Sequence, residues 1–254
     1  MVRIATRAAL LVALSIVSTP GFAAATGTDP IGIAVTDPTR TEADRTRDER
    51  DHTIEVLKFF GIAPGMTVVD LFAGGGYFSE VIGRIVGGGS SGKVYMHNNA
   101  AYQTFIGDAL AERVKGGRLQ NVVKLDAEIG QLGIPPTSVD LVLMSMSYHD
   151  LYFKADDWSV DPNALFAEVH AMLKPGGVLA LIDHSAIAGT GSSAAQTLHR
   201  IDEAFVRKDI ESRGFKFTGS LDVLHNAKDD RTKTVFDPAV RGRTDRFVYR
   251  FVRE

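Results

Sequence analysis

The chain has 254 residues, of which 28 are Lys or Arg and 31 are Asp or Glu, and it contains no cysteine. The formal net charge of −3 argues against nonspecific nucleic-acid binding, which depends on a basic face. The absence of cysteine excludes disulfides, thiolate sites and a lipid-modified cysteine anchor. What remains is a globular chain of a length that one domain can accommodate around a single core.

The N-terminal segment has the layout of a secretory signal peptide. Arg3 and Arg7 precede an apolar run from Ala8 to Val17, and helix-breaking and small residues follow as far as Ala25. The run is shorter than the about 20 residues of a membrane-spanning helix. An uncleaved amphipathic helix is the alternative. We predict cleavage after Ala25, an exported protein that is periplasmic or secreted, and no stable membrane anchor.

The rest of the chain reads as a short leader followed by one domain, residues 41–254. Residues 26–40 are rich in Gly, Pro and Thr without periodicity, which predicts an extended leader. From Thr41 to Phe60 a charged stretch passes into apolar residues at helical spacing. This pattern predicts one helix with a solvated N-terminal half and a packed C-terminal half.

Strands and helices then alternate along the chain. Apolar runs predict strands at 67–72, 93–98, 122–127, 138–148, 178–186, 215–224 and 245–253. Helical patterns lie at 77–86, 101–116, 161–177 and 194–214. Such alternation predicts an α/β fold, a doubly wound and mostly parallel seven-stranded sheet of Rossmann-like type. The last two strands have no helix between them, so we expect them to pair antiparallel at one edge.

A glycine turn follows the first strand. Gly74, Gly75 and Gly76 can adopt positive φ and let a ligand lie on the bare main chain. In open α/β sheets, ligands bind at the carboxyl ends of the strands. The dinucleotide fingerprint fails because Ser79 stands at its third glycine, and no Gly-Lys-Ser/Thr follows to make a P-loop.

The motifs "VVDLFAGGG", "LDAE", "SVDLVLMSMS" and "LKPGGVLALIDH" occur in the order and spacing of a known superfamily. The chain resembles the class I S-adenosylmethionine-dependent methyltransferases over roughly residues 55–253. The leader, "YHDLYF", the "LHRID" segment and the "FDPAVRGRTDRFVY" tail are similar to an exported group of bacterial predicted methyltransferases. The resemblance implies S-adenosyl-L-methionine as cofactor.

The resemblance also implies roles for single residues. Asp70 would order the turn and approach the methionine amino group, and Phe72 replaces the first glycine of the family motif. Asn98 stands where a carboxylate usually holds the ribose, which predicts weakened affinity. Asp126 and Ala127 would meet the adenine. The implied cofactor-binding residues are Asp70, Phe72, Gly74, Gly75, Gly76, Asn98, Asp126, Ala127 and Ser145.

Candidate catalytic residues end the fourth and fifth strands. "SMSYHD" contains His149 and Asp150, and "DHS" contains Asp183 and His184. Neighbouring strands would bring both Asp/His pairs to one cleft. His149 or His184 could act as general base, because imidazole titrates near neutrality. Metal ligands and strand-capping histidines are the alternatives, and His199 is expected, with His170, to be a packing residue.

The predicted function is methyl transfer from S-adenosylmethionine to a small-molecule acceptor, with His149, Asp150 and His184 as catalytic residues and no metal. Prolines typical of amino-directed nucleic-acid methyltransferases are absent from "SMSY", so no nucleic-acid partner is expected. Two alternatives stay open: an exported ligand-binding module of the same fold, or a metal-dependent enzyme using His149 and His184. The tail arginines Arg243 and Arg246 are expected on a solvated edge.

Overall fold

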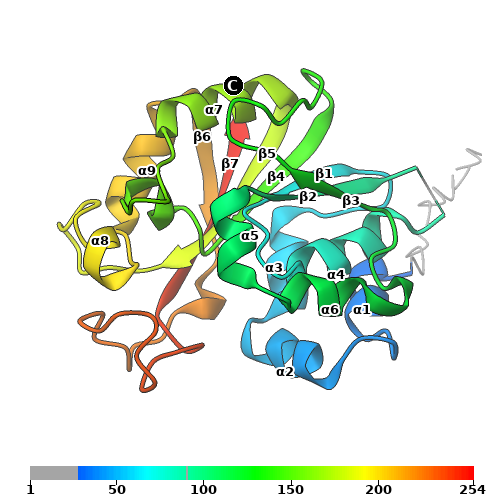
Figure 1. Ribbon diagram of the computed structural model, residues 1–254, viewed down its shortest axis with the longest axis horizontal. Coiled ribbons are helices and arrows are strands. Elements are labelled where there is room, and N and C mark those ends of the chain that lie inside the picture. The colour runs from blue at the N-terminus through cyan, green and yellow to red at the C-terminus, as the bar shows by residue number, and fades with distance from the viewer. Residues whose placement is uncertain (1–27, 90) are drawn as a thin grey trace, which may run out of the picture.

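The computed structural model of the protein describes residues 28–89 and 91–254 (Figure 1). The predicted signal peptide lies outside these described residues. The centre of the molecule is one seven-stranded sheet in the order β3-β2-β1-β4-β5-β7-β6. The strands are β1 (Thr67–Leu71), β2 (Lys93–Asn98), β3 (Val122–Asp126), β4 (Val139–Ser145), β5 (Leu173–His184), β6 (Phe215–Ser220) and β7 (Arg246–Arg253).

The predicted α/β sheet is confirmed. Strands β1 to β5 pair in parallel, and β7 runs antiparallel to both of its neighbours, β5 and β6. The last two strands, β6 and β7, therefore pair antiparallel at one edge of the sheet, as predicted, and β7 is the strand with reversed direction. Strand β5 also begins at Leu173, before the predicted start, because Leu173 already pairs with Val139; the pairing is then irregular across residues 174–177 and resumes at Val178.

Helices cover both faces of the sheet (Figure 1). Apolar residues of α1, α3 and α4 pack on one face, and those of α7 and α9 pack on the other. The helices are α1 (Pro30–Val35), α2 (Glu42–Arg50), α3 (Thr53–Phe60), α4 (Tyr77–Val86), α5 (Ala100–Ile106), α6 (Ala109–Val114), α7 (Pro162–Met172), α8 (Ala195–Leu198) and α9 (Glu203–Glu211). No helix among the described residues is long and apolar enough to cross a membrane.

The structure corrects the expectation of an extended leader. Residues 30–35 of this segment form α1, which begins at Pro30 after Asp29 caps the Gly32 amide. Ile31 and Val35 are buried against the core of the α3 and α4 face. The segment is thus part of the domain, because its few apolar residues fall on one side of a short helix.

The predicted helix from Thr41 to Phe60 is two helices, α2 and α3, separated at His52, whose φ is +47°. The N-terminal half is mostly exposed, as predicted, with two exceptions. Asp44 and Asp48 are buried because arginines pair with them. Two later predicted helices are also interrupted, at Gly107 between α5 and α6, and at residues 199–202 between α8 and α9.

The sheet order determines where a ligand can bind. The chain runs outward from β1 to β2 and β3, then returns to β4 on the other side of β1. At such a reversal, the carboxyl ends of the two central strands leave a crevice. The glycine turn after β1 and the "SMSYHD" segment after β4 meet at this place.

Candidate functional site

The glycine turn is shaped by three residues with positive φ. Phe72, Gly74 and Gly76 have φ values of +52°, +58° and +76°. A Cβ on Gly76 would lie 2.8 Å from Met96 Sδ. Both the positive φ and this lack of space favour glycine at position 76. Gly74 and Gly75 remain partly exposed, whereas Gly76 is buried beneath them. The exposed peptide surface of the turn is therefore that of Gly74 and Gly75.

Asn98 holds this turn, and its predicted contact with a ribose stays a prediction. Its Oδ1 accepts a hydrogen bond from the Gly74 amide at 2.9 Å, and its Nδ2 donates to the Gly74 carbonyl at 3.0 Å. The side chain is 1% exposed. An asparagine makes both bonds, whereas a carboxylate has no proton with which to make the second. The departure from the family pattern therefore has a structural reason.

The predicted adenine residues lie next to β3 but away from the cavities. Asp126 is partly exposed and pairs with Lys124 at 2.5 Å, and the Ala127 carbonyl bonds His97 Nε2 at 2.9 Å. Among the described residues, those that line the two cavities at this edge include neither of them. Their implied contact with an adenine stays a prediction.

A cavity of about 240 Å³ lies over the exposed turn, with both signs of charge in its lining. Asp70 lies on one side, buried, with Ser79 Oγ donating to it at 2.6 Å. Burial raises the pKa of Asp70 to about 6. Arg47 of α2 lines the same cavity, with its guanidinium 3.8 Å from the centre of the Tyr77 ring. Ser145 Oγ is buried there without a hydrogen-bond partner among the described residues.

An aromatic cluster closes this cavity on the side of β4. Phe72 packs against Tyr102 and Trp158, with ring centres 5.1 and 5.4 Å apart. Tyr102 belongs to α5, and its hydroxyl donates to Asp150 at 2.7 Å. Tyr102 lines both cavities at this edge, so α5 forms a partition between them.

A second cavity, of about 350 Å³, lies on the other side of Tyr102. It contains all three predicted catalytic residues, His149, Asp150 and His184. Neighbouring strands β4 and β5 bring the two Asp/His pairs together, as expected. The strongest contact crosses between the pairs: Asp183 accepts from the His149 amide at 2.8 Å and contacts His149 Nδ1 at 2.7 Å. The rest of the wall is mainly aromatic: Tyr102, Phe105, Phe153, Trp158 and Phe236.

The two histidines have opposite protonation preferences. Burial alone would lower the pKa of His149, but the carboxylates of Asp183 and Asp150 outweigh it and raise that pKa to about 10. Burial, together with the nearby His149 charge, places the pKa of His184 well below its ordinary value. His184 Nδ1 contacts Thr244 Oγ1 at 2.7 Å. Beside these carboxylates His149 thus favours the imidazolium form, whereas His184 favours the neutral imidazole.

Several residues in these cavities were not predicted as site residues, among them His199, Arg47 and Tyr102. His199, expected to pack within a helix, ends α8 with φ +52° and lines the second cavity. Arg47 comes from a charged stretch that looked solvated, and Tyr102 from an ordinary helical pattern. The one sequence feature that pointed to His199 was the "LHRID" segment, which is similar to a segment of the exported methyltransferase group. Trp158 both packs and lines the cavity, with Nε1 donating to the Asp150 carbonyl at 2.7 Å.

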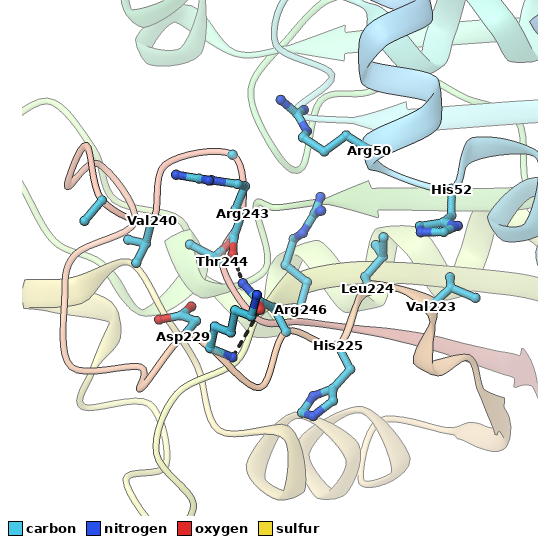
Figure 2. Close-up of a pocket in the computed structure, with 14 residues that line it drawn as sticks. Arg50, His52, Val223, Leu224, His225, Asp229, Val240, Arg243, Thr244 and Arg246 are labelled. Carbon is cyan, nitrogen blue, oxygen red and sulfur yellow. Dashed lines mark hydrogen bonds between the residues drawn. The ribbon is translucent and has the colours of Figure 1, made fainter.

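A third cavity, of about 500 Å³, lies elsewhere, between the start of α3 and the loop before β7. Figure 2 shows Arg50 and His52 on one side of it and Arg243 and Arg246 on the other. Arg246 is 7% exposed and pairs with Asp51 at 3.0 Å, so the expectation of a solvated edge is wrong for this residue. The predicted catalytic residues do not line this cavity, and we place the functional site at the other two.

Comparisons with known proteins agree with this placement. Residues 71–181 match the family model of a methyltransferase domain, which includes the glycine turn and most of β5. No curated protein sequence matches the chain. A S-adenosylmethionine-dependent methyltransferase from Aquifex aeolicus is 23% identical, with a TM-score of 0.56 over 78% of this chain and 87% of that chain.

Two further solved structures show how widely the fold is used. The geranyl diphosphate C-methyltransferase from Streptomyces coelicolor, solved with S-adenosyl-L-homocysteine, is 14% identical, with a TM-score of 0.54 over 87% of this chain and 84% of that chain. The [4+2]-cyclase SpnF is 16% identical, with a TM-score of 0.55 over 83% of this chain and 81% of that chain. At these identities the likeness shows the fold. Residues 71–181 therefore resemble a methyltransferase domain, and the sheet has the Rossmann-like fold of the methyltransferases.

Proposed function

We propose that the protein transfers a methyl group from S-adenosylmethionine to a small-molecule acceptor. The observation that carries the proposal is the adjacency of the two cavities at the carboxyl edge of the sheet. They share Tyr102, Phe105 and Met146 in their walls. The cavity over the glycine turn would hold the methyl donor, and the cavity with the histidines would hold the acceptor.

The residues of the smaller cavity fit the methionine end of the cofactor. That end carries an ammonium and a carboxylate, and the cavity offers Asp70 for the first and Arg47 for the second. Ser145 Oγ and the bare peptides of Gly74 and Gly75 supply further polar contacts. When bound, the cofactor supplies a methyl group on a positively charged sulfur. The nucleoside end would need more room than the about 240 Å³ of this cavity, and movement of Tyr102, which separates it from the second cavity, would provide that room.

The larger cavity fits an aromatic or apolar acceptor with one ionisable O–H or N–H group. Aromatic side chains, among them Phe153, Trp158 and Phe236, supply the apolar walls. His184, neutral and held at Nδ1 by Thr244, would accept the acceptor's proton at Nε2. The His149 imidazolium, fixed by Asp183, would orient Asp150 toward the same space.

Isothermal titration of the purified protein with S-adenosylhomocysteine tests the proposal. We expect saturable binding, and a loss of roughly 10- to 100-fold in affinity for Arg47→Gln, because a charge-assisted contact is removed. Lys115→Gln, at an exposed position outside both cavities, serves as control. Absence of any binding heat with millimolar ligand would contradict the proposal.

One observation favours a second function, a ligand-binding module of this fold without methyl transfer. Asn98 is committed to Gly74, and Tyr102 fills the space beside Phe72. Mass spectrometry of the protein purified without added ligand separates the two functions. A bound adenosyl compound supports methyl transfer, and a different bound compound supports the binding module.

We also propose that the protein is exported, on the strength of the Arg-flanked apolar run that ends in "AAA" at Ala25. N-terminal sequencing of the mature protein tests this. A first residue of Thr26 is the expected result, and a mature protein that still carries Arg3 and Arg7 would contradict export by this route.

A further inference from the structure

Three side chains bring potential metal ligands together in the larger cavity. The atoms are His149 Nε2, Asp150 Oδ1 and His199 Nδ1, and all lie within 4.8 Å of one another. The carboxylate oxygen is 3.2 Å from the His149 nitrogen and 3.5 Å from the His199 nitrogen. Ligand atoms around one small divalent ion are separated by about the same distance, since each bond is about 2 Å long.

Hydrogen bonds to the other atoms of His149 and Asp150 orient the two side chains as in many metal centres. His149 Nδ1 contacts Asp183 Oδ1 at 2.7 Å, which leaves Nε2 directed at the cluster. Metal-binding histidines commonly donate their second ring nitrogen to a carboxylate in this way. The other oxygen of Asp150 accepts from Tyr102 at 2.7 Å, so Oδ1 is the oxygen left for an ion.

His199 is held toward the cluster at a cost to the backbone. Its φ of +52° lies in the left-handed region, which is strained for a residue other than glycine. Its ring packs on Phe153 and Phe236, with centres 4.7 and 4.9 Å away. If His199 only filled space, an apolar residue with negative φ could take its place. The strained backbone of His199 is explained if its imidazole must reach Asp150.

We propose that His149, Asp150 and His199 bind one divalent transition-metal ion in the larger cavity. Two imidazole nitrogens and one carboxylate oxygen favour Zn²⁺, Co²⁺ or Fe²⁺ over Mg²⁺ and Ca²⁺, which prefer oxygen ligands. Three protein ligands leave at least one coordination position open. His184 lines the same cavity, 5.8 Å from His149 between ring centres, and limits which ligand can take that position.

The ion's role rests on the proposed function, whereas its binding does not. An open position in a cavity with aromatic walls would be taken by a hydroxyl or amine of the methyl acceptor. Coordination lowers the pKa of such a group and fixes its direction. The acceptor class would therefore be an aromatic or apolar compound with a metal-binding heteroatom.

Without an ion, the same residues form a different unit, in which a protonated His149 joins Asp183 and Asp150. The two arrangements make different predictions for His199. In the protonated unit His199 is peripheral, at 3.5 Å from Asp150, and its loss would change little. In the metal centre it is a ligand. The experiment therefore turns on this residue.

Untagged full-length protein, stripped with a chelator and dialysed, is titrated with Co²⁺ and then Zn²⁺. We expect one ion per chain, visible absorption bands of ligated Co²⁺, and their loss when Zn²⁺ displaces it. His199→Gln should weaken binding by at least the roughly 10- to 100-fold that follows loss of a supporting contact. His225→Gln, at a histidine of the third cavity, should bind like the unaltered protein.

Two results would overturn the inference: no stoichiometric Co²⁺ or Zn²⁺, or equal affinity in His199→Gln and His225→Gln. S-adenosylhomocysteine binding is measured on the same samples without metal. Because the smaller cavity contains none of the three ligands, retained nucleoside binding with no metal binding removes this inference alone. Metal binding without nucleoside binding instead removes the proposed methyl transfer and leaves the metal centre.

Discussion

Asn98 stands where the family usually has a carboxylate, and its amide binds the glycine turn. Replacing it by aspartate would put a carboxylate oxygen 3.0 Å from the Gly74 carbonyl oxygen, where the amide now donates. We expect Asn98→Asp to weaken S-adenosylhomocysteine binding and to lower the free energy of unfolding by about 1–3 kcal/mol. Urea unfolding and calorimetric titration check both. Asn163→Asp, where the side chain is exposed and accepts from Arg213, should be nearly neutral. Tighter binding by Asn98→Asp would show that the ribose role is correct after all.

Asp70 gives a pH dependence whose sign follows from its burial. Its pKa is raised from an ordinary 3.8 to about 6, so the folded protein holds this proton more tightly than the unfolded chain. The carboxyl therefore costs stability as pH rises from about 4 to 6, and the cost, about 3 kcal/mol, is constant above that range.

We accordingly expect Asp70→Asn to be more stable than the unaltered protein at pH 7 and equal to it near pH 4. Asparagine keeps an acceptor for Ser79 but carries no charge to bury. The same change should weaken S-adenosylhomocysteine binding, because the ligand's ammonium loses its carboxylate. Urea midpoints measured across this pH range give the test. A stability difference that does not vary with pH would contradict the shifted pKa.

At the scale of elements, α5 is the least anchored part of the site. None of its residues is buried, and Phe105 is 75% exposed. Tyr102 attaches it through rings at 5.1 and 5.4 Å and one bond to Asp150. An element with so few buried contacts opens locally at low cost. We therefore treat α5 as the segment that moves when a nucleoside enters.

Tyr102→Ala should make S-adenosylhomocysteine bind faster and about tenfold more tightly. Each aromatic pair is worth about 0.5–1.5 kcal/mol, and removing both lowers the cost of opening α5. Tyr102→Phe keeps the ring contacts and loses only the Asp150 bond, so it separates packing from hydrogen bonding. Stopped-flow binding gives the rates. Weaker binding by Tyr102→Ala would mean that the ring is part of the nucleoside site instead.

Element boundaries show where sequence patterns carry information and where they do not. The strand β1, the glycine turn and α4 were predicted almost to the residue, because apolar runs and glycines are local signals. The interruption at His199 was missed, since a left-handed histidine leaves no trace in apolar periodicity. The charged stretch of α2 was read as solvated, because burial of Asp44 depends on arginines far along the chain.

At the scale of the whole molecule, the sheet determines most of the site. Parallel strands β4 and β5 bring His149 next to Asp183, which the expected neighbourhood of these strands anticipated. The cross-pairing itself, with Asp183 serving His149 rather than His184, depends on side-chain directions that no spacing encodes. The same holds for Asn98, whose partner is a peptide 24 residues away.

A buried ionic network joins three distant parts of the chain behind the glycine turn. Arg113 of α6 pairs with Asp44 of α2 at 2.9 Å and with Glu80 of α4, and its Nε donates to the Gly75 carbonyl at 2.6 Å. Glu80 is fully buried, and Asp44 is 5% exposed. Removing one partner of such a network leaves buried charge without compensation, at a cost of about 3–5 kcal/mol.

We expect Arg113→Ala to lower the free energy of unfolding toward this amount, because the two buried carboxylates each lose a cation; Arg118 still contacts both of them, and Arg84 contacts Glu80. Lys115→Ala, which removes an exposed pair with Glu112, should cost about 0.2–1 kcal/mol. Urea unfolding of the two variants checks the difference. S-adenosylhomocysteine affinity should fall only in Arg113→Ala, since that guanidinium also fixes the turn. Equal, small losses of stability would contradict this expectation and show that Arg118, with Arg84 at Glu80, compensates both carboxylates without Arg113.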